Sequence, residues 1–300
     1  MFIEKGIDVM KKAFKQHTIR ERNPVLSFVT ALVMVITVIF CVVPFLYIIA
    51  ISFSSTSAIS NNRVFLWPVE FNLDAYRSVF HYPHFFRAYG YTLIFTVGGT
   101  FISLFMMVLF AYPLSKTWLR GQKIVMKLVV FSMFFSGGMI PNYLLVSGLH
   151  LTGSVWAILL PFAINQFFLV ILVNFFKSIP KELEEAAMID GLGYFGILFR
   201  VVLPLSRPAL ATIGLYTAVF FWNNWFYPLI YLKADQYPVM LLLRNIVNGG
   251  TAITSDGGQS ALAISIRSAV ILVSTVPIVL LYPFLQKYFV GSIYLGAVKE

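Results

Sequence analysis

Six long apolar stretches, separated by shorter polar segments, run along the 300-residue chain. Each stretch is long enough to cross about 30 Å of hydrocarbon as a helix. The stretches lie near residues 26–52, 88–114, 124–147, 155–176, 208–232 and 262–286. This pattern predicts an all-α integral membrane protein with six transmembrane helices.

Composition supports the membrane prediction. Hydrophobic residues make up 59% of the chain and charged residues only 11%, whereas soluble domains carry about 25% charged residues. The net charge of +10 could suit a nucleic-acid partner, but the basic residues are scattered among the apolar stretches. We therefore interpret them as topological signals and expect no nucleic-acid partner. Most Lys and Arg residues lie before the first stretch and after the second, fourth and sixth, which predicts that both termini are cytoplasmic.

The polar segments divide the chain. We expect a basic cytoplasmic segment that contacts membrane lipid, then a transmembrane domain, then a short cytoplasmic tail. Inside the domain we expect a cytoplasmic loop and a long, polar, flexible outer loop. The three main units cover residues 1–24, 25–290 and 291–300. Inside the transmembrane domain, the cytoplasmic loop covers residues 178–206 and the outer loop covers residues 233–261. Gly137, Gly138 and Pro141 interrupt the third apolar stretch, which indicates either a bend beside a pathway or close helix packing.

The loop over 178–206 contains a short helical pattern. Pro180 suits the first turn of a helix, and acidic residues follow it near the positive end of the helix dipole. Gly191 can adopt the left-handed conformation that ends a helix. The pattern predicts a helix of about 11 residues, roughly 16 Å long. It is too short and too charged to span a bilayer, so it is either an ordinary connector or a docking element.

Several kinds of chemistry are missing from the sequence. The chain has no glycine-rich phosphate loop followed by Lys and Ser or Thr, so any ATP that drives it would be bound, with Mg, by a separate subunit. We expect no metal site, no catalytic residues and no cofactor in this chain. Charged residues are rare in the apolar stretches, and no broken inverted repeats are visible, which argues against an ion-coupled secondary carrier.

Amide and aromatic side chains remain as candidates for a substrate path. Asn174 lies in the fourth apolar stretch, and Trp222, Asn223, Asn224 and Trp225 lie in the fifth. Amides hydrogen-bond to sugar hydroxyls and aromatic faces stack on sugar rings, so the set suits a sugar path. The alternative is that these amides form hydrogen bonds between helices.

The segment Glu185-Ala186-Ala187, then Gly191 and, after a further nine residues, Val201, Leu203 and Pro204, resembles the signature loop of ABC importer permeases. The chain is similar to carbohydrate-uptake permeases of the maltose-type class, most of all those for aldouronates and other complex oligosaccharides. The segments that carry this resemblance are 136–144, 174–180, 222–226, 237–238, 243–246, 286–290 and 296–299.

The resemblance implies a type I ABC importer permease fold in a bacterial cytoplasmic (inner) membrane, with a short coupling helix between transmembrane helices 4 and 5. It implies a second homologous permease that completes the pore, two ATPase subunits and an extracytoplasmic solute-binding protein. The residues implied in ATPase coupling are Glu185, Ala186, Ala187, Asp190, Gly191, Leu203 and Pro204. In this class the partner permease holds most of the sugar contacts.

Two other hypotheses stay open at this point. The same permease fold could import a solute other than a sugar. Alternatively, the chain could be a membrane scaffold or enzyme that works without an ATPase partner.

Overall fold

The computed structural model describes residues 24–249 and 261–280, which fold into helices with one isolated antiparallel bridge between Ser54 and Phe71. The elements are α2 (Pro24–Ser52), α3 (Thr56–Ser60), α4 (Asp74–Phe80), α5 (Phe85–Leu93), η1 (Ile94–Gly98), α6 (Gly99–Ser115), α7 (Gln122–Phe134), α8 (Met139–Gly148), α9 (Trp156–Leu159), α10 (Gln166–Lys177), α11 (Lys181–Ile189), α12 (Tyr194–Ile197), η2 (Leu198–Val202), α13 (Leu203–Leu205), α14 (Arg207–Asn223), α15 (Phe226–Tyr231), η3 (Ala234–Gln236) and α16 (Val239–Gly249). A last described helix covers Ala261–Leu280. The predicted all-α class is confirmed.

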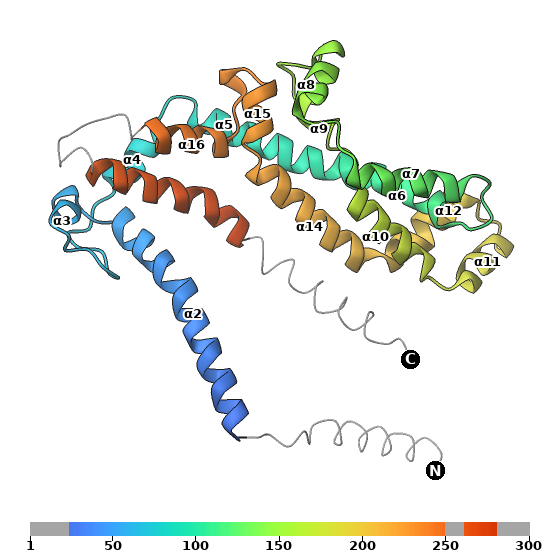
Figure 1. Cartoon of the computed structure of the whole chain (residues 1–300), viewed down its shortest axis with the longest axis horizontal. Coiled ribbons are helices and arrows are strands. Elements are labelled where there is room, and N and C mark those ends of the chain that lie inside the picture. Colours follow the sequence, from blue (N-terminus) through green and yellow to red (C-terminus); the bar gives the residue numbers. More distant parts are fainter. Residues whose placement is uncertain (1–23, 250–260, 281–300) are drawn as a thin grey trace.

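The centre of the structure is a three-helix packing unit. The segment Phe85–Ser115 is one long element with a π-helical turn, η1, in its first half. Helices α10 and α14 pack beside α6 (Figure 1), and their buried side chains share one hydrophobic cluster that includes Met107, Leu172 and Ile213. At Gly99 an added Cβ would lie 2.6 Å from the ring of Phe221. The absence of a side chain there lets α14 approach closely.

Helix α2 stands apart from this unit. Figure 1 shows it pointing away from the other helices, and its apolar side chains are exposed along most of its length. Only its last three residues are buried, and two of them, Ala50 and Ile51, form a cluster with α3 and Ala261. A helix that is apolar all round needs an apolar environment, so lipid or another subunit must cover α2.

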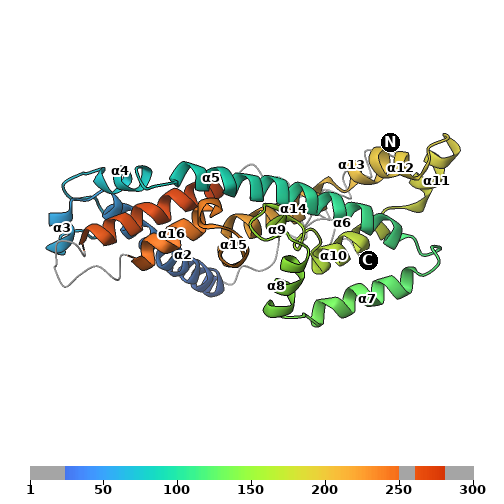
Figure 2. The ribbon, with the colours of Figure 1, turned by 90° about the horizontal axis from the view of Figure 1, so that it is seen from above.

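Two pairs of neighbouring helices meet at sharp bends. Helices α7 and α8 meet at 117° across the Gly137–Gly138 break. The sequence had left a bend and close helix packing open at these glycines. The segment Tyr194–Leu205 meets α14 at 80°, a bend that the sequence analysis did not predict. The stretch at 155–176 is divided into α9 and α10 by a non-helical segment that contains Pro161. Figure 2 shows α7 and α8 beside the central unit.

Among the described residues, three helices are long and apolar enough to cross a membrane: Val25–Ser52, Phe85–Ser115 and Ala261–Leu280. The number rises to five if each bent pair is one span, and α10 is a shorter apolar helix. The predicted segments 1–24 and 291–300 lie outside the described residues, apart from Pro24, as does the end of the sixth predicted span.

The prediction of a flexible polar loop over 233–261 is wrong for its first half. Residues 239–249 form α16, which buries Val239, Leu242 and Leu243 against α4, α5 and the last helix. Apolar residues spaced three and four apart give this helix one buried face. Residues 250–260 of the predicted loop lie outside the described part.

The loop after α2 is held by one carboxylate. Glu70 accepts hydrogen bonds from the hydroxyls of Ser55 and Ser57 and from the guanidinium of Arg63. These donors, Ser55 first, lower the pKa of Glu70 from 4.5 to about 2, because each stabilises the ionised form. At the end of this loop, Asn72 Oδ1 accepts the N–H of Asp74, the first residue of α4, at 2.6 Å.

Candidate coupling helix and translocation path

Helix α11 is the short charged helix predicted in the loop over 178–206. It runs over Lys181–Ile189, nine residues instead of about 11. Pro180 is the N-cap, with ψ 131°, and lies just before the first turn that the sequence analysis assigned to it. Gly191 has φ +83°, so it takes the left-handed conformation expected of a residue that ends a helix.

One side of α11 packs onto the protein and the other is exposed. Ala187 is buried in the hydrophobic cluster of α6, α10 and α14, and Glu184, one turn earlier, is buried beside it. Glu185 and Ala186 are exposed, and Ile189 is 86% exposed. Ala186 and Ala187 therefore lie on different sides of α11, and only Ala186 is exposed to a partner.

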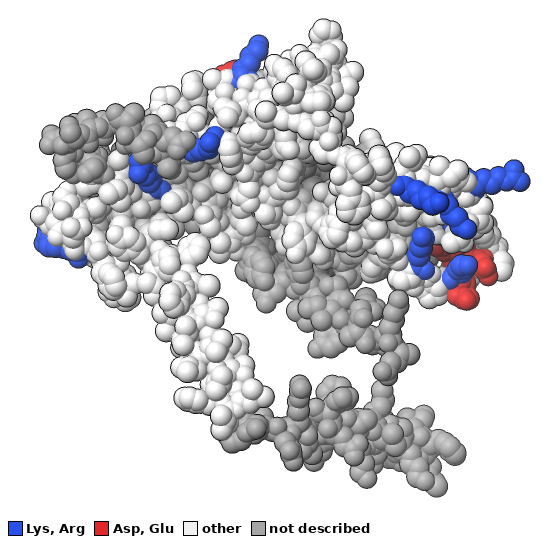
Figure 3. Space-filling model, in the orientation of Figure 1, with Lys and Arg blue, Asp and Glu red and all other residues white. Residues whose placement is uncertain are grey.

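The remaining residues implied in coupling lie around α11. Asp190 and Gly191 are exposed at its end, Leu203 is partly buried in α13, and Pro204 is exposed. Figure 3 shows basic and acidic side chains gathered at the end of the molecule that carries α11 and α12. A polar end with exposed apolar side chains is typical of a protein-binding surface.

A buried ion pair joins α11 to the end of α6. Lys116 Nζ donates to the carboxylate of Glu184, and the two side chains are only 14% and 11% exposed. The same ammonium lies 4.5 Å from the ring centroid of Tyr112, a cation–π distance. The sequence analysis missed this pair because a separation of 68 residues gives no local signal.

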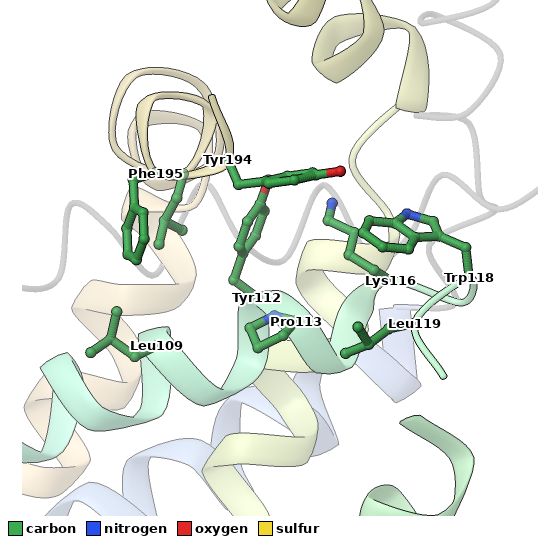
Figure 4. A pocket seen from close by; sticks show the side chains of 9 residues that line it. Leu109, Tyr112, Pro113, Lys116, Trp118, Leu119, Tyr194 and Phe195 are labelled. Atoms are coloured by element: carbon green, nitrogen blue, oxygen red, sulfur yellow. The ribbon is translucent and has the colours of Figure 1, made fainter. Parts of the chain in front are cut away.

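A cavity of about 540 Å³ opens beside Lys116 (Figure 4). Its lining is mostly apolar and aromatic, and the Trp118 and Tyr194 rings lie 5.8 Å apart. The residues that line it are Leu109, Tyr112, Pro113, Lys116, Trp118, Leu119, Tyr194, Phe195 and Leu198. Lys116 thus lines this cavity and also binds Glu184 of α11.

The structure divides the amide and aromatic set predicted for the substrate path. Asn174 is exposed and lies near the end of α10, close to α11 in the chain. Trp222 lies near the last residue of α14, whereas the first residue of α14 follows the loop that contains α11. Trp222 is buried, and its indole N–H donates to the Ser274 carbonyl at 3.1 Å. This contact is the interhelical hydrogen bond that the sequence analysis kept as its alternative.

The other members of the set differ in exposure. Asn224 is buried and accepts the Tyr227 N–H at 3.3 Å, at the start of α15. Asn223 is exposed. Trp225 is partly buried, with the Arg244 guanidinium 3.6 Å from its ring centroid. Of the five residues, Trp222 thus joins two helices, whereas the Asn224 hydrogen bond is local to the turn between α14 and α15.

A second cavity, of about 510 Å³, lies between α6, α10 and α14. It combines hydroxyl, amide and aromatic side chains from three elements that are distant in sequence. Its lining consists of Ser103, Pro161, Phe162, Ile164, Asn165, Gln166, Phe168, Tyr216, Thr217 and Phe220. Amide-rich composition near residue 165 and aromatic residues near 216 were the only sequence signals for it.

Comparison with known proteins identifies relatives along most of the chain, although no protein-family model matches it. Protein LplC of Bacillus subtilis is 44% identical over 263 residues, covering 86% of this chain and 89% of the relative. The polygalacturonan/rhamnogalacturonan transport system permease protein YtcP of Bacillus subtilis is 44% identical over 265 residues, covering 86% and 93%. A crystal structure of a bacterial ABC transporter involved in the import of the acidic polysaccharide alginate matches with a TM-score of 0.83 and 34% identity, covering 90% of this chain and 98% of the matched chain.

Sequence identity well above 30%, near-complete coverage and a shared helical fold agree with the apolar helices described above. The relatives are transporter subunits, and the chain itself is a multi-pass membrane permease subunit, not an enzyme. The chain therefore belongs to the carbohydrate-uptake family of ABC transporter permeases.

Proposed function

We propose that α11 is the coupling helix of this oligosaccharide permease and that its exposed side docks into an ATPase subunit. The observation that carries the proposal is the division of α11 into two sides. Ala187 and Glu184 attach the helix to the permease, while Glu185, Ala186 and Ile189 are exposed for a partner. A large aliphatic side chain that is 86% exposed at a charged end of the molecule gains free energy when a partner covers it.

The proposed assembly contains further subunits. A second homologous permease completes the pore, two ATPases bind ATP and Mg in the cytoplasm, and an extracytoplasmic solute-binding protein delivers the sugar. Because α2 is apolar and exposed, lipid and the second permease are suitable neighbours for it. The chain has six spans in this proposal: three continuous helices, the bent pair of α7 and α8, α9 with α10, and α14.

The proposed topology places both termini, α11 and the residues after α6 in the cytoplasm. The basic residues Lys116, Arg120 and Lys181 lie at this end, in agreement with the positive-inside rule. The domain limits at 1–24, 25–290 and 291–300 follow from this arrangement. Asp190, Gly191, Leu203 and Pro204 then flank the docking site.

The proposed substrate is an oligosaccharide. The similarity to a polygalacturonan/rhamnogalacturonan permease and to a transporter involved in alginate import supports this class. The cavity between α6, α10 and α14 supports it as well, because it offers both hydrogen-bonding groups and aromatic faces to a sugar.

Glu185→Ala in the assembled transporter tests the docking proposal. We expect loss of sugar uptake and of ATPase co-purification, with unchanged membrane insertion of the permease. The matched control is Asp74→Ala, which removes an exposed carboxylate from a short helix elsewhere in the chain. Full ATPase recovery and full uptake with Glu185→Ala would refute the docking role of α11.

A further inference from the structure

Helix lengths indicate how deep in the bilayer the cavity between α6, α10 and α14 lies. From Ser103 to Lys116 the helical rise is roughly 20 Å, from Gln166 to Lys177 roughly 17 Å, and from Tyr216 to Arg207 roughly 14 Å. The charged ends of all three helices face the same side of the protein, next to α11. Half of a hydrocarbon core of about 30 Å is about 15 Å, so three helices agree on a midplane position.

Polar groups at this depth are not suited to lipid. Asn165 is exposed in the described chain, and Tyr216 is 56% exposed. An amide or phenol facing hydrocarbon without a partner is costly. These side chains must therefore face a water-filled path or another subunit. Ser103 adds a hydroxyl that is fully buried, lines the cavity and has no hydrogen-bond partner among the described residues.

The start of α10 gives the cavity positive potential. Asn165 Oδ1 accepts the Phe168 N–H at 3.1 Å, and the Leu169 N–H bonds to the Asn165 carbonyl. The N–H groups of Gln166 and Phe167 have no acceptor inside the helix. They lie at the positive end of the helix dipole, where an anionic group is stabilised. None of the side chains that line the cavity is charged.

Aromatic side chains form the walls beside this helix end. Phe168 and Tyr216 are stacked with ring centroids 5.7 Å apart, and Phe162 lies 5.3 Å from Phe220. Flat aromatic walls with hydroxyl and amide donors suit a sugar ring. The helix start suits a carboxylate.

We propose that this cavity binds the carboxylate-bearing ring of an acidic oligosaccharide as it crosses the membrane. Asn165 and Gln166 at the start of α10 meet the carboxylate, Ser103 donates to a ring hydroxyl, and the Phe168–Tyr216 pair contacts the ring. The inference rests on the proposed function, since it concerns the substrate of the same importer. It places sugar contacts in this subunit, at residues other than Trp222 to Trp225.

Two substitutions at Asn165 separate charge from helix capping. Ser and Asp both replace Asn well as N-caps, so Asn165→Ser and Asn165→Asp both preserve the start of α10. Only Asn165→Asp adds a negative charge beside the carboxylate site. We expect it to lower uptake of α-1,4-linked trigalacturonate on the order of tenfold to a hundredfold below Asn165→Ser. The measurement is uptake by the complete transporter in proteoliposomes, normalised to assembled complex.

Gln166→Glu against Gln166→Ala provides a second pair if an Asn165 variant fails to assemble, because the first helical turn accepts an acidic residue. Equal trigalacturonate uptake within a pair would overturn the carboxylate site and leave the importer function intact. Import of neutral α-1,4-linked galactotriose but not of trigalacturonate by the unsubstituted transporter would also overturn it. If the assembled transporter imports no oligosaccharide at all, the proposed function itself fails.

Discussion

Breaking the ion pair between Lys116 and Glu184 should separate α11 from α6. The two side chains are 14% and 11% exposed, so neither charge can be solvated by water when its partner is removed. Leaving one partner of a buried pair alone costs about 3–5 kcal/mol. We expect Glu184→Leu or Lys116→Met to lower the stability of the permease by this amount and to reduce uptake.

The double variant distinguishes the pair from two independent contributions. Lys116→Met with Glu184→Leu leaves no buried charge, so it should be more stable than either single variant. A double-mutant cycle on thermal unfolding of the purified transporter gives the interaction energy, and we expect about 2–3 kcal/mol. The same variants are assayed for ATPase activity stimulated by loaded binding protein. If the pair transmits movement from α11 to α6, the double variant should keep its fold but lose sugar uptake per ATP hydrolysed.

An exposed pair provides the control. Arg87 and Asp235 are joined at 3.0 Å across 148 residues, but their side chains are 50% and 48% exposed. Exposed pairs contribute about 0–1 kcal/mol, so the same cycle there should give less than about 1 kcal/mol. An interaction energy at Lys116–Glu184 no larger than at this control would refute the reasoning from burial.

Three further results are expected. Gly99→Ala should destabilise the permease by about 1–3 kcal/mol in thermal unfolding, since the new Cβ would meet the Phe221 ring at 2.6 Å; an unchanged melting temperature would contradict this packing. Gly191→Ala should lower the stability of the permease by about 1–2 kcal/mol and reduce ATPase coupling. The cause is the φ of +83° and not crowding, because no atom lies within 4 Å of the new Cβ. Gly191→Asn should lose less stability, because Asn tolerates this conformation. The carboxylate of Glu70, with a pKa lowered from 4.5 to about 2, should stabilise the loop after α2 fully above pH 4.5 and progressively less as the pH falls toward 2. Fluorescence of the neighbouring Trp67 should report this transition, and it should be absent in Glu70→Gln.

The sequence by itself determined the features that depend on local pattern. Apolar runs of membrane-spanning length identified the class, because a bilayer of fixed thickness requires them. The short helix before Gly191 also followed from local backbone preferences, whereas the glycines at 137 and 138 left both a bend and close helix packing open. The spacing of Glu185, Gly191 and Pro204 carried the family resemblance that the comparisons confirmed.

Only the tertiary structure decided which side of each helix is used. The helical pattern alone does not tell whether Ala187 faces the permease or a partner, since that depends on where α6 and α10 lie. The Lys116–Glu184 pair and the burial of α16 result from contacts between segments far apart in sequence. The cavity between α6, α10 and α14 likewise needs Ser103, Gln166 and Tyr216 from three helices. Such long-range contacts arise only when the helices pack, because hydrophobic periodicity specifies a buried face without specifying what covers it.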